Sequence, residues 1–165
     1  MGVAGCGKSS IAQQAAAALG WPLIEGDEFH SDANRERMRR GIALTDQDRA
    51  AWLATLAEEL RTTPRPVVLT CSALKAAYRD QLRSAAPGLR FAFLRIAPDV
   101  ALQRVAARAS HFFSPALVSS QFAALEDPSG ELRVLTLDAT DSLAQLGHQL
   151  VRWIETEEQA KEIQP

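Results

Sequence analysis

The sequence has few cysteines, no long apolar run and no visible targeting segment. Its two cysteines, Cys6 and Cys71, are too few for a disulfide framework. We therefore expect two reduced thiols, as in a reducing cytoplasm, in preference to a redox pair. No hydrophobic stretch approaches the roughly 18 residues of a transmembrane helix. No basic segment followed by an apolar one marks a secretory signal. These absences predict a cytoplasmic protein without a membrane span.

An excess of charge of one sign is also missing. Eighteen Lys and Arg residues stand against 20 Asp and Glu residues, for a net charge of −2. This balance argues against general binding to nucleic acid or to an anionic membrane. There is no internal repeat and no low-complexity linker. A length of 165 residues with 47% hydrophobic residues is typical of one globular domain, spanning residues 1–165.

A glycine-rich motif at the start of the chain carries the clearest chemical signal. Residues 2–9 fit the pattern G-x-x-x-x-G-K-[ST] without a mismatch. Such a loop surrounds nucleotide phosphates with backbone N–H groups, and a helix that follows adds its N-terminal dipole to the anion site. The lysine is expected to reach the β- and γ-phosphates, and the first serine to bind Mg²⁺. The predicted nucleotide-binding residues are Gly2, Val3, Ala4, Gly5, Cys6, Gly7, Lys8, Ser9 and Ser10.

One part of this motif is missing from the sequence. A phosphate loop ordinarily follows a buried β-strand, but here Met1 directly precedes Gly2. Two expectations follow. Either Met1 is the last residue of that strand and the start is assigned too late, or the domain works without the strand.

The rest of the chain alternates between apolar strand patterns and amphipathic helix patterns. Strands are predicted at 22–24, 67–71, 91–96 and 134–138. Helices are predicted from Ser9 to a stop at Gly20, from a capping box at 45–48, over 75–85, from Pro98 through Arg108, near 117–125, and over 142–157. This alternation predicts an α/β fold with a parallel sheet between helical layers. With the absent strand, the sheet would have five strands.

Asp27 is the predicted general base. It follows the apolar strand at 22–24, and ligands of open α/β sheets bind beyond the carboxyl ends of strands. A carboxylate there could accept a hydroxyl proton or hold a metal-bound water. It could equally cap the helix that follows. The strand at 67–71 ends without an aspartate, so a second Mg²⁺ contact is expected from Glu25 or Asp27.

Two arginines suggest a lid over the nucleotide. Arg104 and Arg108 lie four residues apart and so on one helix face, next to an aromatic, proline-containing interruption at 111–115. They indicate a segment around 104–118 that brings positive charge over the phosphates. The alternative is a solvated basic face. Trp52, by contrast, is expected in the core.

In these motifs the chain resembles the bacterial-type gluconate kinases, a family of small-molecule kinases with phosphate loops. The resemblance covers nearly the whole chain. Besides the loop, it rests on Gly26-Asp27-Glu28-Phe29-His30, Asn34, Met38, Gly41, residues 44–49, Trp52-Leu53, Cys71-Ser72-Ala73-Leu74-Lys75, Tyr78-Arg79-Asp80, Leu82-Arg83, Arg104, Arg108, His111-Phe112-Phe113, Gln121-Phe122 and Leu125-Glu126.

The resemblance implies ATP-dependent, Mg²⁺-assisted phosphorylation of D-gluconate at its 6-hydroxyl by a cytoplasmic homodimer. The fold it implies is a three-layer sheet ordered as in nucleoside monophosphate and shikimate kinases, with a substrate-binding helical region around 28–62. The implied catalytic residues are Asp27, Lys8 and Arg108, the implied metal-side residues are Ser9 and Asp27, and Arg104 is implied to lie over the nucleotide. The implied substrate-binding residues are Asp27, His30, Arg49, Lys75, Arg79 and His111.

Two other functions remain open at this stage. One is a related kinase acting on shikimate, another sugar acid or a nucleoside monophosphate. The other is a nucleotide-binding protein without activity, a reading motivated by the absent strand.

Overall fold

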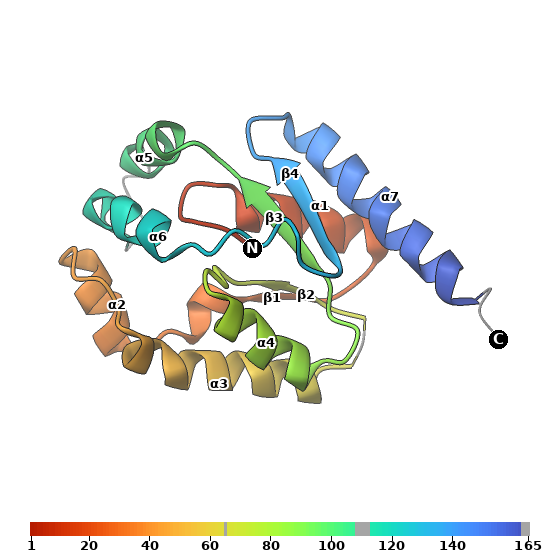
Figure 1. Ribbon diagram of the computed structural model, residues 1–165, viewed down its shortest axis with the longest axis horizontal. Helices are drawn as coiled ribbons and strands as arrows, with labels where there is room; N and C mark the ends of the chain where they lie inside the picture. Colours follow the sequence, from red (N-terminus) through yellow and green to blue (C-terminus); the bar gives the residue numbers. More distant parts are fainter. Residues whose placement is uncertain (65, 108–112, 163–165) are drawn as a thin grey trace.

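In the computed structural model, the described residues are 1–64, 66–107 and 113–162, and they form an α/β fold (Figure 1). Four strands lie in two parallel pairs, β1 (Leu23–Glu25) with β2 (Val68–Thr70), and β3 (Phe91–Arg95) with β4 (Val134–Asp138). The longer helices are α1 (Lys8–Leu19), α2 (Asp32–Arg39), α3 (Asp46–Thr62), α4 (Ala76–Ala85), α5 (Pro98–Ala106), α6 (Val118–Ala124) and α7 (Leu143–Glu162). Short 3₁₀ helices lie at η1 (Gly26–Phe29) and η2 (Pro115–Leu117).

The four predicted strands are confirmed, with β4 at its predicted bounds. The pairing is parallel in both cases, from Leu23 opposite Val68 and from Phe91 opposite Val134. The sheet differs from the prediction in one respect. The described strands form two separate pairs, since no described strand joins β2 to β3.

Two helix boundaries are fixed as the sequence predicts. Gly20 ends α1 in the left-handed conformation, with φ of 68°. Thr45 caps α3, accepting a hydrogen bond from the Asp48 backbone, while the Asp48 carboxylate accepts one from the Thr45 backbone. This reciprocal pair is the predicted capping box. In the lid region, α5 ends at Ala106, short of the predicted extent through Arg108.

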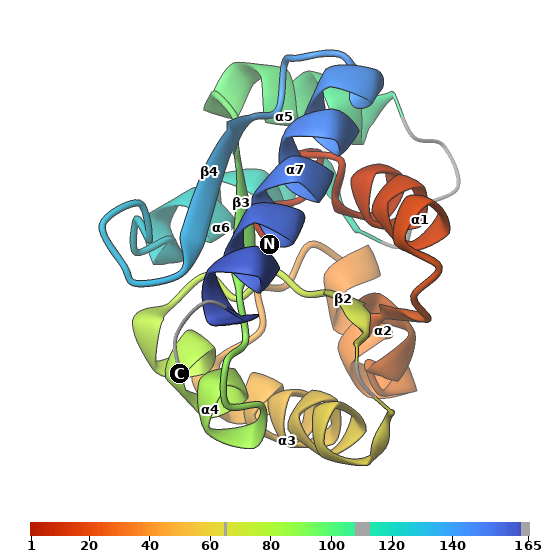
Figure 2. The ribbon, with the colours of Figure 1, turned by 90° about the vertical axis from the view of Figure 1, so that its right-hand side faces the viewer.

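Helices cover both faces of the strands. In Figures 1 and 2, α1 and α7 lie together on one side and α3 and α4 on the other. Two hydrophobic clusters match these layers. One joins α1, α5, α6 and α7 to Leu94 and Leu137, and the other joins α3 and α4 to Cys71 and Phe91. Trp52 is 3% exposed in the second cluster, as predicted for a core residue.

The first two residues lie between the strand pairs (Figure 1). The terminal amino group of Met1 donates to the Ala92 carbonyl at 2.6 Å, and the Met1 carbonyl accepts from the Leu94 N–H at 3.0 Å. On the other side, the Gly2 N–H donates to the Ser72 carbonyl at 3.2 Å. The phosphate loop is thus attached to both halves of the sheet at its front end.

None of the described helices combines the length and apolar character that a bilayer span requires.

Candidate active site

The glycine-rich loop adopts backbone conformations that side chains disfavour. Gly5 and Gly7 have φ of 82° and 95°. A Cβ atom on Gly5 would lie 2.7 Å from the Ala101 carbonyl oxygen of α5, so this glycine also permits the close approach of a helix. The loop runs directly into α1, which begins at Lys8. Its N–H groups therefore stand at a helix N-terminus, a favourable place for an anion.

Lys8 and Gln121 stabilise the conformation of the loop through hydrogen bonds to its backbone. The Lys8 ammonium donates to the carbonyl oxygens of Gly2 and Val3, each at 3.1 Å. The Gln121 amide oxygen accepts a hydrogen bond from the Ala4 N–H at 2.6 Å, across 117 residues of sequence. Gln121 is itself buried. Sequence reasoning gave it no role, although it belongs to the motif that carries the family resemblance.

A carboxylate stands beside the serine that follows Lys8. The Ser9 hydroxyl donates to Glu25 Oε2 at 3.1 Å, and the Thr70 hydroxyl donates to the same oxygen at 2.7 Å. Thr70 in turn accepts from the Gly26 N–H at 3.1 Å. The other oxygen of this carboxylate, Oε1, is buried and has no hydrogen-bond partner among the described residues. The end of β1 thus places an acceptor next to Ser9.

One small pocket of about 70 Å³ brings the loop and the predicted base together. Asp27, in η1 directly after β1, lines it opposite loop residues. Its walls consist of Ala4, Gly5, Gly7, Lys8, Ser9, Asp27, His30, Met38, Arg49, Ser72, Val105, Phe113 and Gln121. Gly2, Val3, Cys6 and Ser10 belong to the predicted motif but do not line this pocket. Sequence reasoning had not placed Met38, Ser72, Val105 or Phe113 at the site.

His30 lines the pocket, and its imidazole is neutral near pH 7. Its ring stacks on Trp52, with centroids 4.3 Å apart, and Trp52 Nε1 donates to the Gly26 carbonyl at 2.8 Å. Burial is the main reason that the pKa of His30 falls to about 4, with Arg49 and Arg35 adding to the effect and Asp27 opposing it. The Nδ1 atom is buried without a hydrogen-bond partner among the described residues. An unused polar atom at a pocket wall is suited to a ligand hydroxyl.

Arg49 supplies positive charge at the pocket wall. It lies in the first turns of α3, and its Nε donates to the Leu44 carbonyl at 3.5 Å. An arginine so placed can bind a carboxylate through two parallel hydrogen bonds. The pocket therefore combines an anion-binding loop, a carboxylate and a cation.

The structure does not bring Lys75 to this pocket. Its ammonium contacts both carboxylate oxygens of Asp46 at 2.7 Å, and the Tyr78 hydroxyl donates to the same carboxylate. The hydrogen bond from Lys75 lowers the pKa of Asp46, while burial raises the pKa of Tyr78 to about 12. These three residues connect the start of α3 to α4. Lys75 thus pairs with Asp46 and does not line the pocket.

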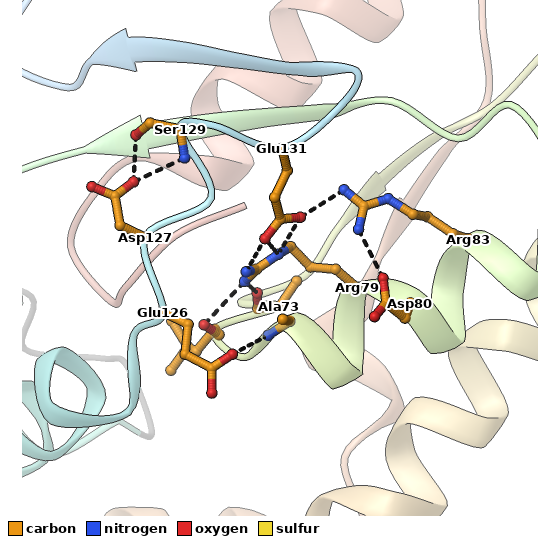
Figure 3. Close-up of polar contacts among 10 residues, drawn as sticks. Ala73, Arg79, Asp80, Arg83, Glu126, Asp127, Ser129 and Glu131 are labelled. Atoms are coloured by element: carbon orange, nitrogen blue, oxygen red, sulfur yellow. Dashed lines mark hydrogen bonds and ion pairs between the residues drawn. The ribbon is translucent and has the colours of Figure 1, made fainter.

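Arg79 likewise does not line the pocket. Its side chain is 1% exposed and forms an ion pair with Glu131, which also pairs with Arg83 at 2.7 Å (Figure 3). Arg79 Nη1 donates to the carbonyls of Ala73 and Leu74 at 2.9 and 3.1 Å. Hydrogen bonds from Arg79 are the main reason that the pKa of Glu131 is lowered. The guanidinium is fully engaged in connecting α4 to the segment before β4.

The predicted lid residues are only partly described. Arg104, on α5, donates to the Ala139 carbonyl just beyond β4 at 2.9 Å and does not line the pocket. Arg108 and His111 lie outside the described residues. Phe113, within the predicted lid segment, lines the pocket.

Both cysteines are free and buried, as expected for reduced thiols. Burial raises the pKa of Cys71 to about 11, so its thiol stays protonated near neutral pH.

The oxygen atoms in and beside the pocket fit a nucleotide-bound Mg²⁺. Mg²⁺ takes oxygen ligands, often only one or two from protein, and keeps waters and substrate phosphates as the others. The Ser9 hydroxyl and the Glu25 carboxylate, with its unpartnered oxygen, match this preference. No cluster of three or more His, Cys, Asp or Glu residues occurs in the described part of the chain, so a cage built wholly of protein ligands is absent there.

Comparisons with known proteins agree with this geometry. Residues 1–127 match the family model described as AAA domain. Gluconokinase from Gluconobacter oxydans is 37% identical, over 96% of this chain and 90% of its own length, and thermoresistant gluconokinase from Escherichia coli is 39% identical, over 87% and 84%. The crystal structure of a gluconokinase from Sinorhizobium meliloti superimposes with a TM-score of 0.90 at 42% identity, covering 99% of this chain and 94% of that one.

Proposed function

The chain belongs to the gluconokinase family, and from this premise we propose that it transfers the terminal phosphoryl group of ATP to the 6-hydroxyl of D-gluconate. The product would be 6-phospho-D-gluconate. One observation carries the proposal: a single pocket joins the phosphate loop, with Lys8 and Ser9, to Asp27 and Arg49. Phosphoryl transfer to an anionic acceptor needs these three elements side by side.

The loop holds the nucleotide phosphates. Its N–H groups and the α1 dipole face the anion, and the Lys8 ammonium exchanges its contacts with loop carbonyls for contacts with phosphate oxygens. Ser9 would hold Mg²⁺, with the carboxylates of Glu25 and Asp27 as the candidate metal-side groups. When bound, the ion neutralises charge on the phosphates and orients them.

Asp27 accepts the proton of the attacking hydroxyl. The 6-oxygen forms a bond to the γ-phosphorus, the bond between that phosphorus and the β–γ bridging oxygen breaks, and ADP leaves. A carboxylate beside the phosphate-binding loop is placed for this role.

Arg49 and His30 orient the sugar acid. Arg49 binds the gluconate carboxylate, and the unpartnered His30 Nδ1 bonds a hydroxyl group. Because His30 is neutral near pH 7, it adds no charge of its own. In this proposal the segment around 104–118 is the lid, Arg104 and Arg108 act on the nucleotide, and His111 acts on the substrate. Residues 28–62 form the substrate-binding region of this one kinase domain. From the family resemblance, we also propose that the protein is a homodimer in the cytoplasm.

The test is a coupled assay with ATP, Mg²⁺ and D-gluconate. Asp27→Asn should lower kcat by about 10²- to 10⁴-fold, as removal of a general base does. The adjacent, exposed Glu28 does not line the pocket, so Glu28→Gln is the matched control and should retain activity. Normal turnover by Asp27→Asn would refute the assigned base.

A panel of acceptors separates the alternatives. Faster turnover of shikimate, another sugar acid or a nucleoside monophosphate would show that this acceptor, and not gluconate, is the substrate. ATP binding without turnover of any acceptor would indicate a catalytically inactive nucleotide-binding protein.

A further inference from the structure

The side-chain amide of Gln121 lies at the active-site pocket with only one of its two ends engaged by the described residues. Gln121 belongs to α6, is 7% exposed and lines the pocket that the phosphate loop shares with Asp27. Its amide oxygen accepts the Ala4 N–H at 2.6 Å, which attaches α6 to the loop (Figure 1). Its amide nitrogen has no hydrogen-bond partner in the described part of the chain. A side chain buried this deeply, with a donor unused, is suited to a ligand.

The orientation of this amide follows from its contact with the loop. A backbone N–H can only donate, so the end of the side chain that faces Ala4 is the oxygen. The NH₂ group is then the other end, with two hydrogens to donate. This nitrogen is not sealed inside the protein, whereas His30 Nδ1 is. Gln121 therefore offers the pocket a neutral hydrogen-bond donor whose direction is set by the loop itself.

The neighbours of Gln121 indicate which ligand group this donor meets. Ala4, Lys8 and Asp27 line the same pocket. The lysine of a phosphate loop reaches the β- and γ-phosphates, so the group that lies between the loop and the base is the γ-phosphoryl group. Charge spreads over its three outer oxygens in the transition state, and donors already aimed at those oxygens stabilise it. A donor bonded to the loop is placed for this group.

The groups assigned to the sugar acid come from a different part of the chain. His30 follows η1 and Arg49 lies on α3, both in the segment after β1. Gln121 is bonded to the phosphate loop and has no hydrogen bond to that segment among the described residues. The loop side of the pocket is the nucleotide side, which favours a phosphoryl oxygen over an acceptor hydroxyl as its partner.

We propose that Gln121 is a further catalytic residue, whose amide N–H group donates a hydrogen bond to an outer oxygen of the γ-phosphoryl group. This inference rests on the proposed kinase function. In the transfer, the phosphorus leaves the β–γ bridging oxygen and bonds the acceptor oxygen, whose proton goes to Asp27. Gln121 gives and takes no proton, and its bond to the moving phosphoryl group strengthens as charge develops on the outer oxygens.

The first test measures nucleotide binding and needs no acceptor. Gln121→Met is neutral, keeps the length of the side chain and removes the donor. By isothermal titration calorimetry with Mg²⁺, its Kd for β,γ-methylene-ATP should rise about tenfold more than its Kd for ADP. A residue that only shaped the loop would weaken both nucleotides equally, because the loop binds phosphates that both share. Gln103→Met, at an exposed position of α5 outside the pocket, is the matched control and should change neither Kd.

The second test separates the two ends of the amide. Gln121→Glu keeps an oxygen toward the Ala4 N–H and replaces the donor with a second oxygen. Its kcat should fall by about 10²-fold, as loss of one such donor does, while its Kd for ADP changes less than its Kd for the ATP analogue. Relative to the parent, kcat should recover as pH falls toward the pKa of the new carboxyl group, because the protonated form donates again. Gln103→Glu should behave as the parent at every pH.

Two outcomes would overturn the proposal. Equal effects of Gln121→Met on both nucleotides, including no effect on either, would leave Gln121 with at most a structural role in the loop. A raised KM for gluconate with an unchanged ratio of the two Kd values would assign the donor to the acceptor. Failure of the proposed function is a separate result, since it would appear as absent turnover of gluconate by the parent chain and would leave the binding comparison intact.

Discussion

At the scale of single residues, the positively charged side chains differ in whether a carboxylate of the protein already pairs with them. Arg49 lines the pocket, whereas Lys75 pairs with Asp46 and Arg79 pairs with Glu131. All three are cations in motifs that resemble one family. Only the partner distinguishes them, and a buried arginine with its carboxylate is a structural pair, not a free binding group.

His30 should make the free energy of unfolding depend on pH. The unfolded side chain binds a proton below its ordinary pKa of 6.5, but the folded one does so only below about 4. Between these values the unfolded state holds more protons, so stability is present above pH 6.5 and is lost as pH falls toward 4. His30→Phe keeps a ring on Trp52 and removes the titration. We expect its Tm to fall less than that of the parent between about pH 7 and pH 5.

Thermal unfolding followed by circular dichroism measures both slopes. Equal slopes for the parent and His30→Phe would show that folding does not lower the pKa of His30.

The same residues show how far the sequence could predict the site. The loop and Asp27 were predicted from local motifs, and His30 and Arg49 from the family resemblance. Asp27, His30, Arg49 and part of the loop line the pocket. The engagement of Arg79 could not be predicted, because Glu131 lies 52 residues further along and carries no motif. The link from Gln121 to the loop spans 117 residues and was missed for the same reason.

At the scale of elements, the sequence predicts a helix end correctly where a capping motif or a glycine marks it. The capping box begins α3 and Gly20 ends α1 as predicted. The end of α5 at Ala106 carries no such signal, and the sequence pattern continued it through Arg108.

The contact between the loop and α5 leads to a prediction about Gly5. Gly5→Ala introduces a disfavoured φ and a Cβ 2.7 Å from the Ala101 carbonyl, so the loop must shift. We expect the KM for ATP to rise by about tenfold or more, the effect of losing over 1 kcal/mol of binding. Gly20→Ala has a similar φ of 68° but meets open space, and should reduce stability by about 1 kcal/mol without changing this KM. Steady-state kinetics with varied ATP test both.

The attachment of α4 leads to a prediction about Arg79. Arg79→Met leaves Glu131 without its buried partner, which typically costs about 3 kcal/mol, or about 6–12 °C in Tm. Arg83 is more exposed at 27%, and Arg83→Met should cost much less. For Arg79→Lys, which keeps a charge, the KM for gluconate should stay unchanged. A large rise in that KM with little loss of Tm would return Arg79 to the substrate site.

At the scale of the whole molecule, the phosphate loop is the junction between two half-sheets. Its front end bonds to β3 through Met1 and to the segment after β2 through Gly2, while Ala4 bonds to Gln121 beyond the lid region. Two hydrophobic clusters lie on opposite sides of this junction. A ligand that orders the loop should therefore stabilise the whole fold, because each half is attached to it.

Nucleotide binding should accordingly raise Tm in a Mg²⁺-dependent way. At about 100 times Kd, a ligand adds about 2.7 kcal/mol of stability, or about 5–10 °C for a chain of this size. Ser9→Ala removes the hydroxyl that faces Glu25, so its shift with ATP and Mg²⁺ should fall to the shift seen with ATP and a chelator. Ser84→Ala, on the exposed side of α4, is the matched control and should keep the full shift. Differential scanning calorimetry distinguishes the outcomes, and a full Mg²⁺-dependent shift in Ser9→Ala would move the metal site to the carboxylates alone.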